Sequence, residues 1–360
     1  MRKIGVTFGA DHYVPVLKVK RGEKKALQTI AASLRSRITP LLEIVERNPD
    51  KASTIDRHLD TAFKDLASAV RAYRRCLFDT REIEPDGSSA ATAVFRRAAR
   101  EGITFTPVTG LSRTADVAAA LRHRDNGIAV RLTREEFERG ALTNDINAFM
   151  TKHGLRRREV DVIVDLGAVD DLVRDGVATF AAEFLAEVPD QTEWRTLTIS
   201  ACAFPASMGG VERNSRSYVE RNEWRVWRDE LHANRQRLTR LPTYSDCAIQ
   251  HPKGVEGFDP RTMQVSAAVR YTRPEDWLLI KGESTRNTPP SEQFPDLATQ
   301  LVYGHLRRDF SGASHCPGCA AMKAAADGAG GFGSAEAWRR LGTIHHITSV
   351  VEGLAALPWP

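Results

Sequence analysis

The chain has 360 residues, of which 42% are hydrophobic and 27% charged, and its net charge of +5 is only mildly basic. This composition is ordinary for a globular protein, and the chain is long enough to bury a core without disulfides. No apolar run approaches the roughly 18 residues of a membrane span, and the first residues lack the apolar core of a signal peptide. The odd number of cysteines, five, fits a reducing compartment. We therefore expect a cytoplasmic protein with no membrane partner. The charge permits a nucleic-acid partner without requiring one.

Short apolar runs alternate with amphipathic helical stretches over the first two thirds of the chain. The eight runs cover residues 13–18, 38–44, 76–79, 104–109, 127–131, 160–165, 196–200 and 244–249. Strands that recur between helices form βαβ units and a parallel sheet. Eight such units over this length favour a closed, TIM-like (β/α)8 barrel over an open sheet. We expect this α/β barrel to span residues 10–255.

The period changes after the eighth run. Residues 263–270 and 276–281 predict an added β-hairpin, residues 284–296 a loop, and residues 296–310 and 335–354 helices. We expect residues 256–360 to form a hairpin and a helical C-terminal appendage that covers the barrel mouth.

An arginine-rich segment follows the seventh run, and residues 217–240 predict one long helix. Arginines interleaved with Trp224 and Trp227 suit phosphate contact and base stacking. The acidic residues mixed among them instead favour an outer barrel helix with its tryptophans facing the core.

Acidic residues lie at or beside several predicted strand ends, where a (β/α)8 barrel builds its active site. The candidates are Glu43, Asp79, Asp165 and Asp246, with His251 close behind the last strand. They could serve as acid–base groups, with His251 as proton carrier, or they could hold a divalent metal through their oxygens. The alternative is a paired ionic network that only stabilises the barrel.

Basic residues accompany these carboxylates. Lys18 and Arg131 end two predicted strands, and Arg270 and Lys281 end the two hairpin runs. If the hairpin folds over the mouth, all four could bind an anionic group of a ligand. A solvated hairpin rim is the alternative for Arg270 and Lys281.

A Cys-Pro-Gly-Cys segment in the appendage is a candidate metal site. Two thiolates at the spacing of Cys316 and Cys319 can chelate one zinc ion, and His345 or His346 could complete the site. A redox dithiol and a metal-free packed turn are the alternatives.

Several short motifs resemble one known family. They are the segment 13–23, the Pro-Leu-Leu-Glu of residues 40–43, Phe204-Pro205, Ser245-Asp246 followed by His251-Pro252, the Cys-Pro-Gly-Cys of residues 316–319, and Trp338-Arg339 leading to His345 and His346. In order and spacing they resemble the Beta-protein family of bacteria and phages. The resemblance implies that Lys18, Glu23, Glu43, Asp246, His251, Cys316, Cys319 and His346 belong to the family's pattern. It also implies a phage-related setting in which anti-phage defence is a plausible role.

These observations lead to two expectations about function. The first is an enzyme, a hydrolase or lyase, that acts on an anionic and phosphate-bearing ligand such as a nucleotide or a nucleic-acid end. The second is a non-catalytic ligand sensor, or an interaction subunit with a protein partner in a defence or toxin–antitoxin-like complex. An enzyme needs strand-end carboxylates converging at a cavity, whereas a scaffold would have them salt-bridged below a plugged mouth.

Overall fold

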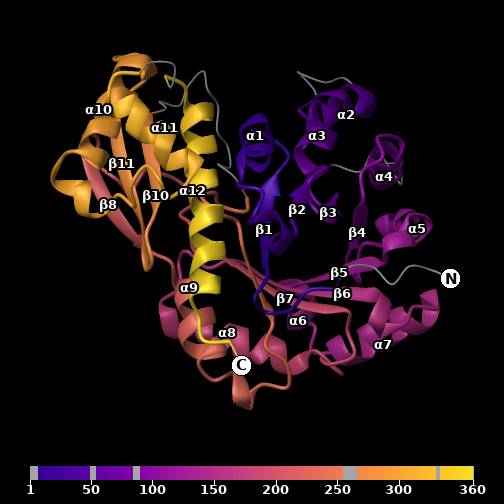
Figure 1. Ribbon diagram of the computed structural model, residues 1–360. Helices are drawn as coiled ribbons and strands as arrows, with labels where there is room; N and C mark the ends of the chain where they lie inside the picture. The colour runs from indigo at the N-terminus through magenta and orange to yellow at the C-terminus, as the bar shows by residue number, and fades with distance from the viewer. Residues whose placement is uncertain (1–6, 49–53, 84–89, 254–265, 330–332, 360) are drawn as a thin grey trace.

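A closed barrel of eight parallel strands forms the larger part of the structure, a computed structural model that describes residues 7–48, 54–83, 90–253, 266–329 and 333–359 (Figure 1). The strand order is β1-β2-β3-β4-β5-β6-β7-β9. The strands are β1 (Tyr13–Lys18), β2 (Leu41–Glu43), β3 (Cys76–Asp79), β4 (Phe105–Thr109), β5 (Ile128–Thr133), β6 (Val160–Ala168), β7 (Thr196–Cys202) and β9 (Thr243–Asp246). The expected (β/α)8 architecture is confirmed.

Helices connect successive strands and cover the outside of the barrel. They are α1 (Arg21–Thr29), α2 (Ile55–Phe63), α3 (Leu66–Val70), α4 (Ala90–Arg100), α5 (Thr114–Arg122), α6 (Arg134–Glu138), α7 (Leu142–His153) and α8 (Arg174–Glu187). Each buries an apolar face: in α4, Val94 and Phe95 are fully buried while Arg97 and Arg100 end the helix on the outside. Burial of such faces, rather than intrinsic helix propensity, supplies most of the stability of short helices.

A buried ionic cluster closes the amino-terminal end of the barrel. Asp161, near the start of β6, accepts hydrogen bonds from Arg75 Nη1 at 2.6 Å, from Arg195 Nη2 at 2.7 Å and from Thr196 Oγ1 at 2.8 Å. Sequence analysis did not find this cluster, because both arginines precede their strands by a single residue and look like loop residues. We call Arg75, Asp161 and Arg195 the floor cluster.

A second, antiparallel sheet lies beside the barrel. It has the order β10-β11-β8, in which β10 (Ser266–Thr272) and β11 (Asp276–Ser284) form the expected hairpin and β8 (Ser215–Glu220) comes from the loop after β7. Helices α10 (Pro290–Val302), α11 (Pro317–Ala326) and α12 (Ala335–Ala355) pack with it, and α12 runs on past β1 (Figure 1). The expected division at residues 255/256 and the expected hairpin start at residues 263–265 lie outside the described residues. None of the described helices is both long and apolar enough to cross a bilayer.

The prediction of one long helix over residues 217–240 was wrong. Residues 215–220 alternate between half-buried and exposed and pair with β11, with Ser217 opposite Leu279. Helical structure begins only at α9 (Asn222–Val226) and continues as a π-helical turn over Trp227–His232. The charged residues of this segment are spaced as in a helix, and this pattern decided the prediction. The alternation typical of a strand is recognisable only beside the partner strand β11, which lies far along the chain. The two tryptophans, Trp224 and Trp227, are buried as the outer-helix alternative requires.

Two further segments begin helices earlier than expected. Helix α10 starts at Pro290, inside the predicted loop 284–296, because proline suits the first helical position. Helix α11 starts at Pro317, inside the Cys-Pro-Gly-Cys segment.

Candidate active site at the barrel mouth

The strand ends bring five of the candidate residues together inside the mouth of the barrel. Lys18, Glu43 and Asp79 are paired in the register of β1, β2 and β3, so their side chains lie on the same face of the sheet. Arg131 and Asp165 join them on the inner face of the barrel. Arg131 is the centre of the group: its Nη1 donates to Glu43 at 2.6 Å and to Asp79 at 2.9 Å, and its Nε donates to Asp165 at 2.9 Å. Lys18 Nζ lies 2.8 Å from Glu43. We call these five residues the mouth cluster.

The loops that follow β3 and β4 add two arginines that sequence analysis missed. Arg81 Nη1 donates to Asp165 at 2.7 Å, and Arg113 Nη1 lies 2.8 Å from Asp79. Glu82, also missed, forms an ion pair with Lys18. A weak signal existed for Arg81, which follows the β3 carboxylate by only two residues. Arg113 gave none, because it belongs to a loop whose path only the folded barrel determines.

The carboxylates of the mouth cluster are held in their ionised form. Burial alone would raise the pKa of Glu43, but the Arg131 guanidinium and the Lys18 ammonium outweigh it and keep that pKa below its ordinary value. Burial likewise opposes ionisation of Asp79 and Asp165, and the neighbouring guanidiniums again hold both pKa values low. A carboxylate with a lowered pKa is a poor general acid near neutrality.

The position of Arg131 also bears on the expected divalent metal. Its guanidinium occupies the point on which Glu43, Asp79 and Asp165 converge. Their oxygens are therefore committed to nitrogen donors. Within the described part of the chain, these three do not form a group of carboxylates close enough to share an ion. The arrangement fits a guanidinium-centred network better than a carboxylate metal site.

A cleft of about 820 Å³ opens over the mouth cluster. Its lining includes the cationic side chains of Arg81, Arg113, Arg131, Arg134 and Lys253, the carboxylates of Glu135, Glu136, Asp165, Asp170 and Asp171, and His251. His251 Nδ1 accepts a hydrogen bond from the backbone N–H of Lys253 at 3.3 Å, so its proton lies on Nε2, which is 3.4 Å from Asp170. The structure thus brings His251 to the same cleft as Arg131 and Asp165. In the part of the chain that the structure describes, every residue that lines the cleft comes before residue 254. The cleft is therefore lined by the barrel and not by the appendage.

Asp246 does not join the mouth cluster, and the expectation that it shares this cavity was wrong. Its side chain lies on the outer face of β9, where it accepts hydrogen bonds from Tyr13 at 2.5 Å and Tyr244 at 2.7 Å. Tyr13 and Lys18 are an odd number of residues apart on β1 and so point to opposite faces. His346 Nε2 lies 3.0 Å from the Asp246 carboxylate. A strand-end position alone could not tell the two faces of β9 apart.

Asp246, Tyr13, Tyr244 and His346 form an outer network that also includes Glu223, a residue that sequence analysis missed. The charged form of Glu223 is disfavoured in this network. Burial raises the pKa of Glu223 to about 8, and the nearby Asp246 carboxylate adds to the effect while Arg221 opposes it. For Asp246 burial is outweighed by His346 and by Arg221, so its pKa is about 2. The space beside Glu223 and Tyr244 is only about 10 Å³, room for a water molecule at most. The network therefore joins the barrel to α9 and α12 rather than receiving a ligand.

The two cations of the hairpin do not reach the mouth cluster either. Arg270 Nη1 donates to the carbonyl of Ile249 at 2.7 Å, and its guanidinium stacks on Phe204. Lys281 Nζ donates to the carbonyls of Met208 at 2.8 Å and Val211 at 2.7 Å. The hairpin pairs with β8 through β11, and these two cations anchor the loops after β7 and β9.

Of the four candidate metal ligands in the appendage, three come together and one lies apart. Cys316, Cys319 and His345 come together between α11 and α12, whereas His346 faces Asp246 and Thr272. Adjacent residues on a helix point about 100° apart, so only one of the two histidines can face the thiols.

The fold and the mouth define a (β/α)8-barrel protein with an ion-lined cleft at the carboxyl ends of its strands. The chain belongs to the Beta protein family, whose model matches residues 13–352. A search of curated proteins gives no match.

Two solved structures show weak likeness to this chain. One is the carboxyl transferase domain of Rhizobium etli pyruvate carboxylase, at 12% identity and a TM-score of 0.34 over 66% of this chain and 40% of that one. The other is a mandelate racemase/muconate lactonizing protein from Herpetosiphon aurantiacus, at 11% identity and a TM-score of 0.34 over 79% of this chain and 66% of that one. The chain thus spans less than two thirds of either structure.

Proposed function

We propose that the barrel mouth binds an anionic, phosphate-bearing ligand and that the protein is a hydrolase or lyase acting on it. The observation that carries this proposal is how deeply the positive and the negative side chains are buried below the cleft. The side chains of Glu43, Asp79 and Asp165 are 1%, 0% and 5% exposed, whereas those of Arg81 and Arg113 are 29% and 20% exposed. Arg81 and Arg113 thus lie nearer the cleft than the buried carboxylates, and they present two guanidiniums to a cleft whose lining as a whole carries as many carboxylates as cationic side chains.

The carboxylates act in this proposal as positioning residues. Each one fixes a guanidinium by a short, charge-assisted hydrogen bond, and a pre-positioned guanidinium can grip a phosphate through two parallel bonds. Because their pKa values are low, they remain ionised and keep the arginines in place across the neutral range.

His251 is the proton-transfer group in this proposal. It lines the cleft with its Nε2 proton toward Asp170, and an imidazole ring can both donate and accept a proton. Asp170 also accepts a hydrogen bond from the backbone N–H of Ala206 at 3.2 Å, so the carboxylate that orients the imidazole is itself held.

Binding is the first measurement. Inorganic phosphate, pyrophosphate and nucleoside mono- and triphosphates are titrated into the full chain by calorimetry. Arg81→Gln and Arg113→Gln should each weaken the best probe tenfold or more, since a hydrogen bond to a charged group contributes about 1.5–3 kcal/mol. Arg97→Gln is the matched control, because Arg97 pairs with Asp60 and Glu101 on the outside of the barrel. Failure of every probe to bind would overturn the proposal.

A second candidate, a non-catalytic ligand sensor, is favoured by the complete pairing of the strand-end carboxylates. Turnover separates the two. An enzyme releases product from the bound probe, and His251→Asn should then abolish release while leaving the dissociation constant within about threefold. Tight binding without product from any probe would favour the sensor.

A further inference from the structure

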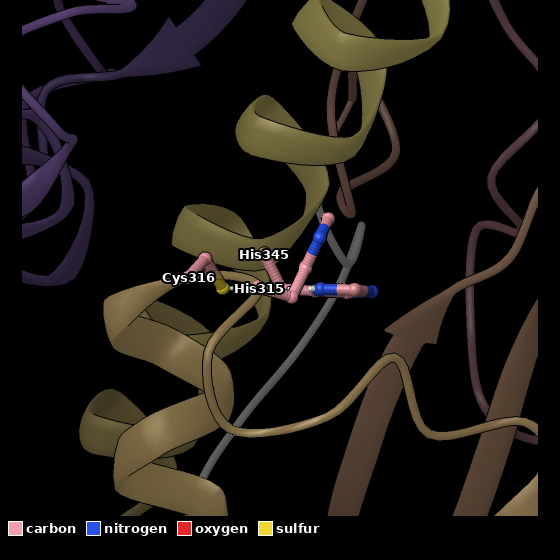
Figure 2. Close-up of side chains that lie close together, drawn as sticks. All are labelled: His315, Cys316 and His345. Atoms are coloured by element: carbon pink, nitrogen blue, oxygen red, sulfur yellow. Dashed lines mark hydrogen bonds between the residues drawn. The ribbon is translucent and has the colours of Figure 1, made fainter.

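A cluster of two thiols and two imidazoles lies where α11 meets α12, outside the barrel mouth. His315 and Cys316 lie on the connection into α11, Cys319 is in its first turn, and His345 comes from the middle of α12. Figure 2 shows His315, Cys316 and His345 close together, and one ligand atom from each lies within 4.8 Å of the others. All five cysteines of the chain are free, so neither thiol is committed to a disulfide.

We propose that Cys316, Cys319, His345 and His315 form a structural zinc site. His345 Nδ1 lies 3.9 Å from the sulfur of Cys316 and 3.3 Å from that of Cys319. Zinc–sulfur bonds of about 2.3 Å and zinc–nitrogen bonds of about 2.0 Å, set at tetrahedral angles, place sulfur and nitrogen about 3.5 Å apart. The two distances fall on either side of that value, and a Cys2His2 donor set is one that zinc commonly takes in structural sites.

The local sequence brings both thiols to one point. Cys316 caps α11, and its sulfur accepts a hydrogen bond from the backbone N–H of Cys319 at 3.2 Å. Gly318 permits the close packing of this turn on α12, since a Cβ there would lie 2.6 Å from the carbonyl oxygen of Leu341. A larger residue at position 318 would push the thiols away from His345.

The surroundings prepare His345 to be a ligand. Its Nε2 lies 2.7 Å from the carbonyl of Thr272, which can only accept, so Nε2 carries the proton and Nδ1 offers its lone pair to the thiols. A hydrogen bond from the second ring nitrogen to a carbonyl is the usual way proteins orient a metal-binding histidine. The Tyr271 ring stacks on His345 at 3.9 Å, and its hydroxyl lies 3.4 Å from the Cys319 sulfur.

The fourth ligand differs from the one expected from sequence. His346 is turned toward Thr272 and Asp246, with its Nδ1 2.9 Å from the Thr272 hydroxyl. His315 takes its place, because one of its ring nitrogens lies within 4.8 Å of ligand atoms of Cys316 and His345. Its Nδ1 lies 3.2 Å from the Glu352 carboxylate and its Nε2 lies 3.2 Å from the Ser349 hydroxyl, so metal binding would replace one of these two contacts. The metal would therefore hold α11 against α12, and the hydrogen bond from His345 to Thr272 would link the site to β10. It would stabilise an appendage that has a smaller core than the barrel.

The redox alternative has one feature in its favour and two against it. Cys316 opens a helix, as the attacking cysteine of a dithiol oxidoreductase does. However, Cys316 is 5% exposed and Cys319 is 0% exposed, so a partner disulfide cannot reach either sulfur without local unfolding. A redox Cys-x-x-Cys motif also belongs to a βαβ pattern, whereas Cys316 follows the helical segments α10 and His305–Arg308.

The test is the zinc content of the full chain, purified without a histidine tag and without chelators. Elemental analysis should find about one zinc per chain. Cys319→Ser and His345→Ala should each lower it at least tenfold. Two matched controls should keep it: His346→Gln alters the neighbouring histidine, and Cys76→Ala removes a buried free thiol in β3.

A second measurement covers the case in which the ligand variants fail to fold. The wild-type chain is stripped with a chelator and reloaded with Co²⁺, which should give thiolate-to-cobalt charge-transfer bands and the intense visible bands of a tetrahedral site. A chain that takes up neither metal, a cobalt spectrum without thiolate bands, or a purified protein lighter by two hydrogens because Cys316 and Cys319 form a disulfide would each overturn the proposal. Equal zinc loss in His345→Ala and His346→Gln would overturn the ligand assignment.

Discussion

The two ends of the barrel carry buried ionic clusters built in opposite ways. At the amino-terminal end, one carboxylate, Asp161, lies between the guanidiniums of Arg75 and Arg195. At the carboxyl end, one guanidinium, Arg131, lies between three strand-end carboxylates. Both arrangements satisfy the rule that buried charges are paired and hydrogen-bonded. They differ in what surrounds them.

The floor cluster is buried on all sides, whereas the mouth cluster is in contact with residues that line the cleft. The side chains of Arg75, Asp161 and Arg195 are each 1% exposed, so their charges act on one another and on buried neighbours such as His12. The mouth cluster is paired with two further residues, Arg81 and Arg113, whose guanidiniums line the cleft. Burial of paired charge at the amino-terminal end of a (β/α)8 barrel serves stability, while the carboxyl end serves ligands. The comparison predicts that substitutions at the two ends will separate stability from binding.

The largest effect on stability is expected at the floor, from Asp161→Asn. The amide replaces one acceptor oxygen by a donor that faces a guanidinium, and it leaves two buried cations without a counter-charge. Breaking a buried pair in this way costs about 3–5 kcal/mol of unfolding free energy. Urea unfolding measures the cost, and calorimetry should find the dissociation constant of the best phosphate probe within about twofold of wild type.

Asp60→Asn is the matched control for this change. Asp60 pairs with Arg97 on the outside of the barrel and its side chain is 65% exposed, so its loss should cost no more than about 1 kcal/mol. Similar losses for Asp161→Asn and Asp60→Asn would contradict the structural role of the floor cluster. A large change in probe affinity for Asp161→Asn would contradict the separation of the two ends.

A smaller loss of stability but a clear loss of binding is expected from Asp165→Asn at the mouth. Asp165 Oδ2 accepts from both Arg131 and Arg81, and its Oδ1 accepts from the backbone N–H of Gly167 at 3.0 Å. The cost in unfolding free energy should be about 1–3 kcal/mol, because Arg131 keeps its other two carboxylates. Probe affinity should fall about tenfold, since Arg81 loses its anchor. Unchanged affinity would show that Asp165 does not position Arg81.

The sequence was a good guide to the barrel because each strand carries its own local signal. The run 13–18 coincides with β1 and the run 76–79 with β3, and the alternation of β-branched runs with helices needs no long-range information. Strand β8 escaped because its charged, half-exposed residues are strand-like only beside β11, about 60 residues later.

The candidate site was only partly predictable for a related reason. Lys18, Glu43, Asp79, Arg131 and Asp165 could be named from strand ends, but their roles depend on which charges meet. Asp246 shows the limit: a shift of one residue in a strand moves a side chain to the other face, and boundaries read from sequence are less exact than that. Arg113 and the floor arginines lie outside strands, so only the closed barrel shows that they belong to the clusters.

The smallest expected effect concerns pH. The loss of unfolding free energy caused by Asp161→Asn should itself depend on pH. Burial by itself would raise the pKa of Asp161, but Arg75 and Arg195 outweigh it and hold the pKa at about 2, below the ordinary value of 3.8. A lowered folded-state pKa contributes stability that is fully present above the ordinary pKa and is lost as the pH falls toward the folded value. The difference in unfolding free energy between wild type and Asp161→Asn should therefore be constant above about pH 5 and shrink below pH 4, by at most about 1.4 kcal/mol per pH unit.

Comparison of the two proteins removes the other groups that titrate. Burial lowers the pKa of His12 to about 3, which destabilises both proteins in acid. Glu223, with its pKa raised to about 8, is protonated in the folded chain throughout this range, and in the unfolded chain it becomes protonated below its ordinary value of 4.5, so its slope vanishes toward about pH 3. Urea unfolding of wild type and Asp161→Asn across this range gives the difference curve. A difference that stays constant down to about pH 2 would mean that Asp161 binds its proton equally well in both states. In that case the floor arginines would not hold its charge, and the contrast between the two ends of the barrel would fail.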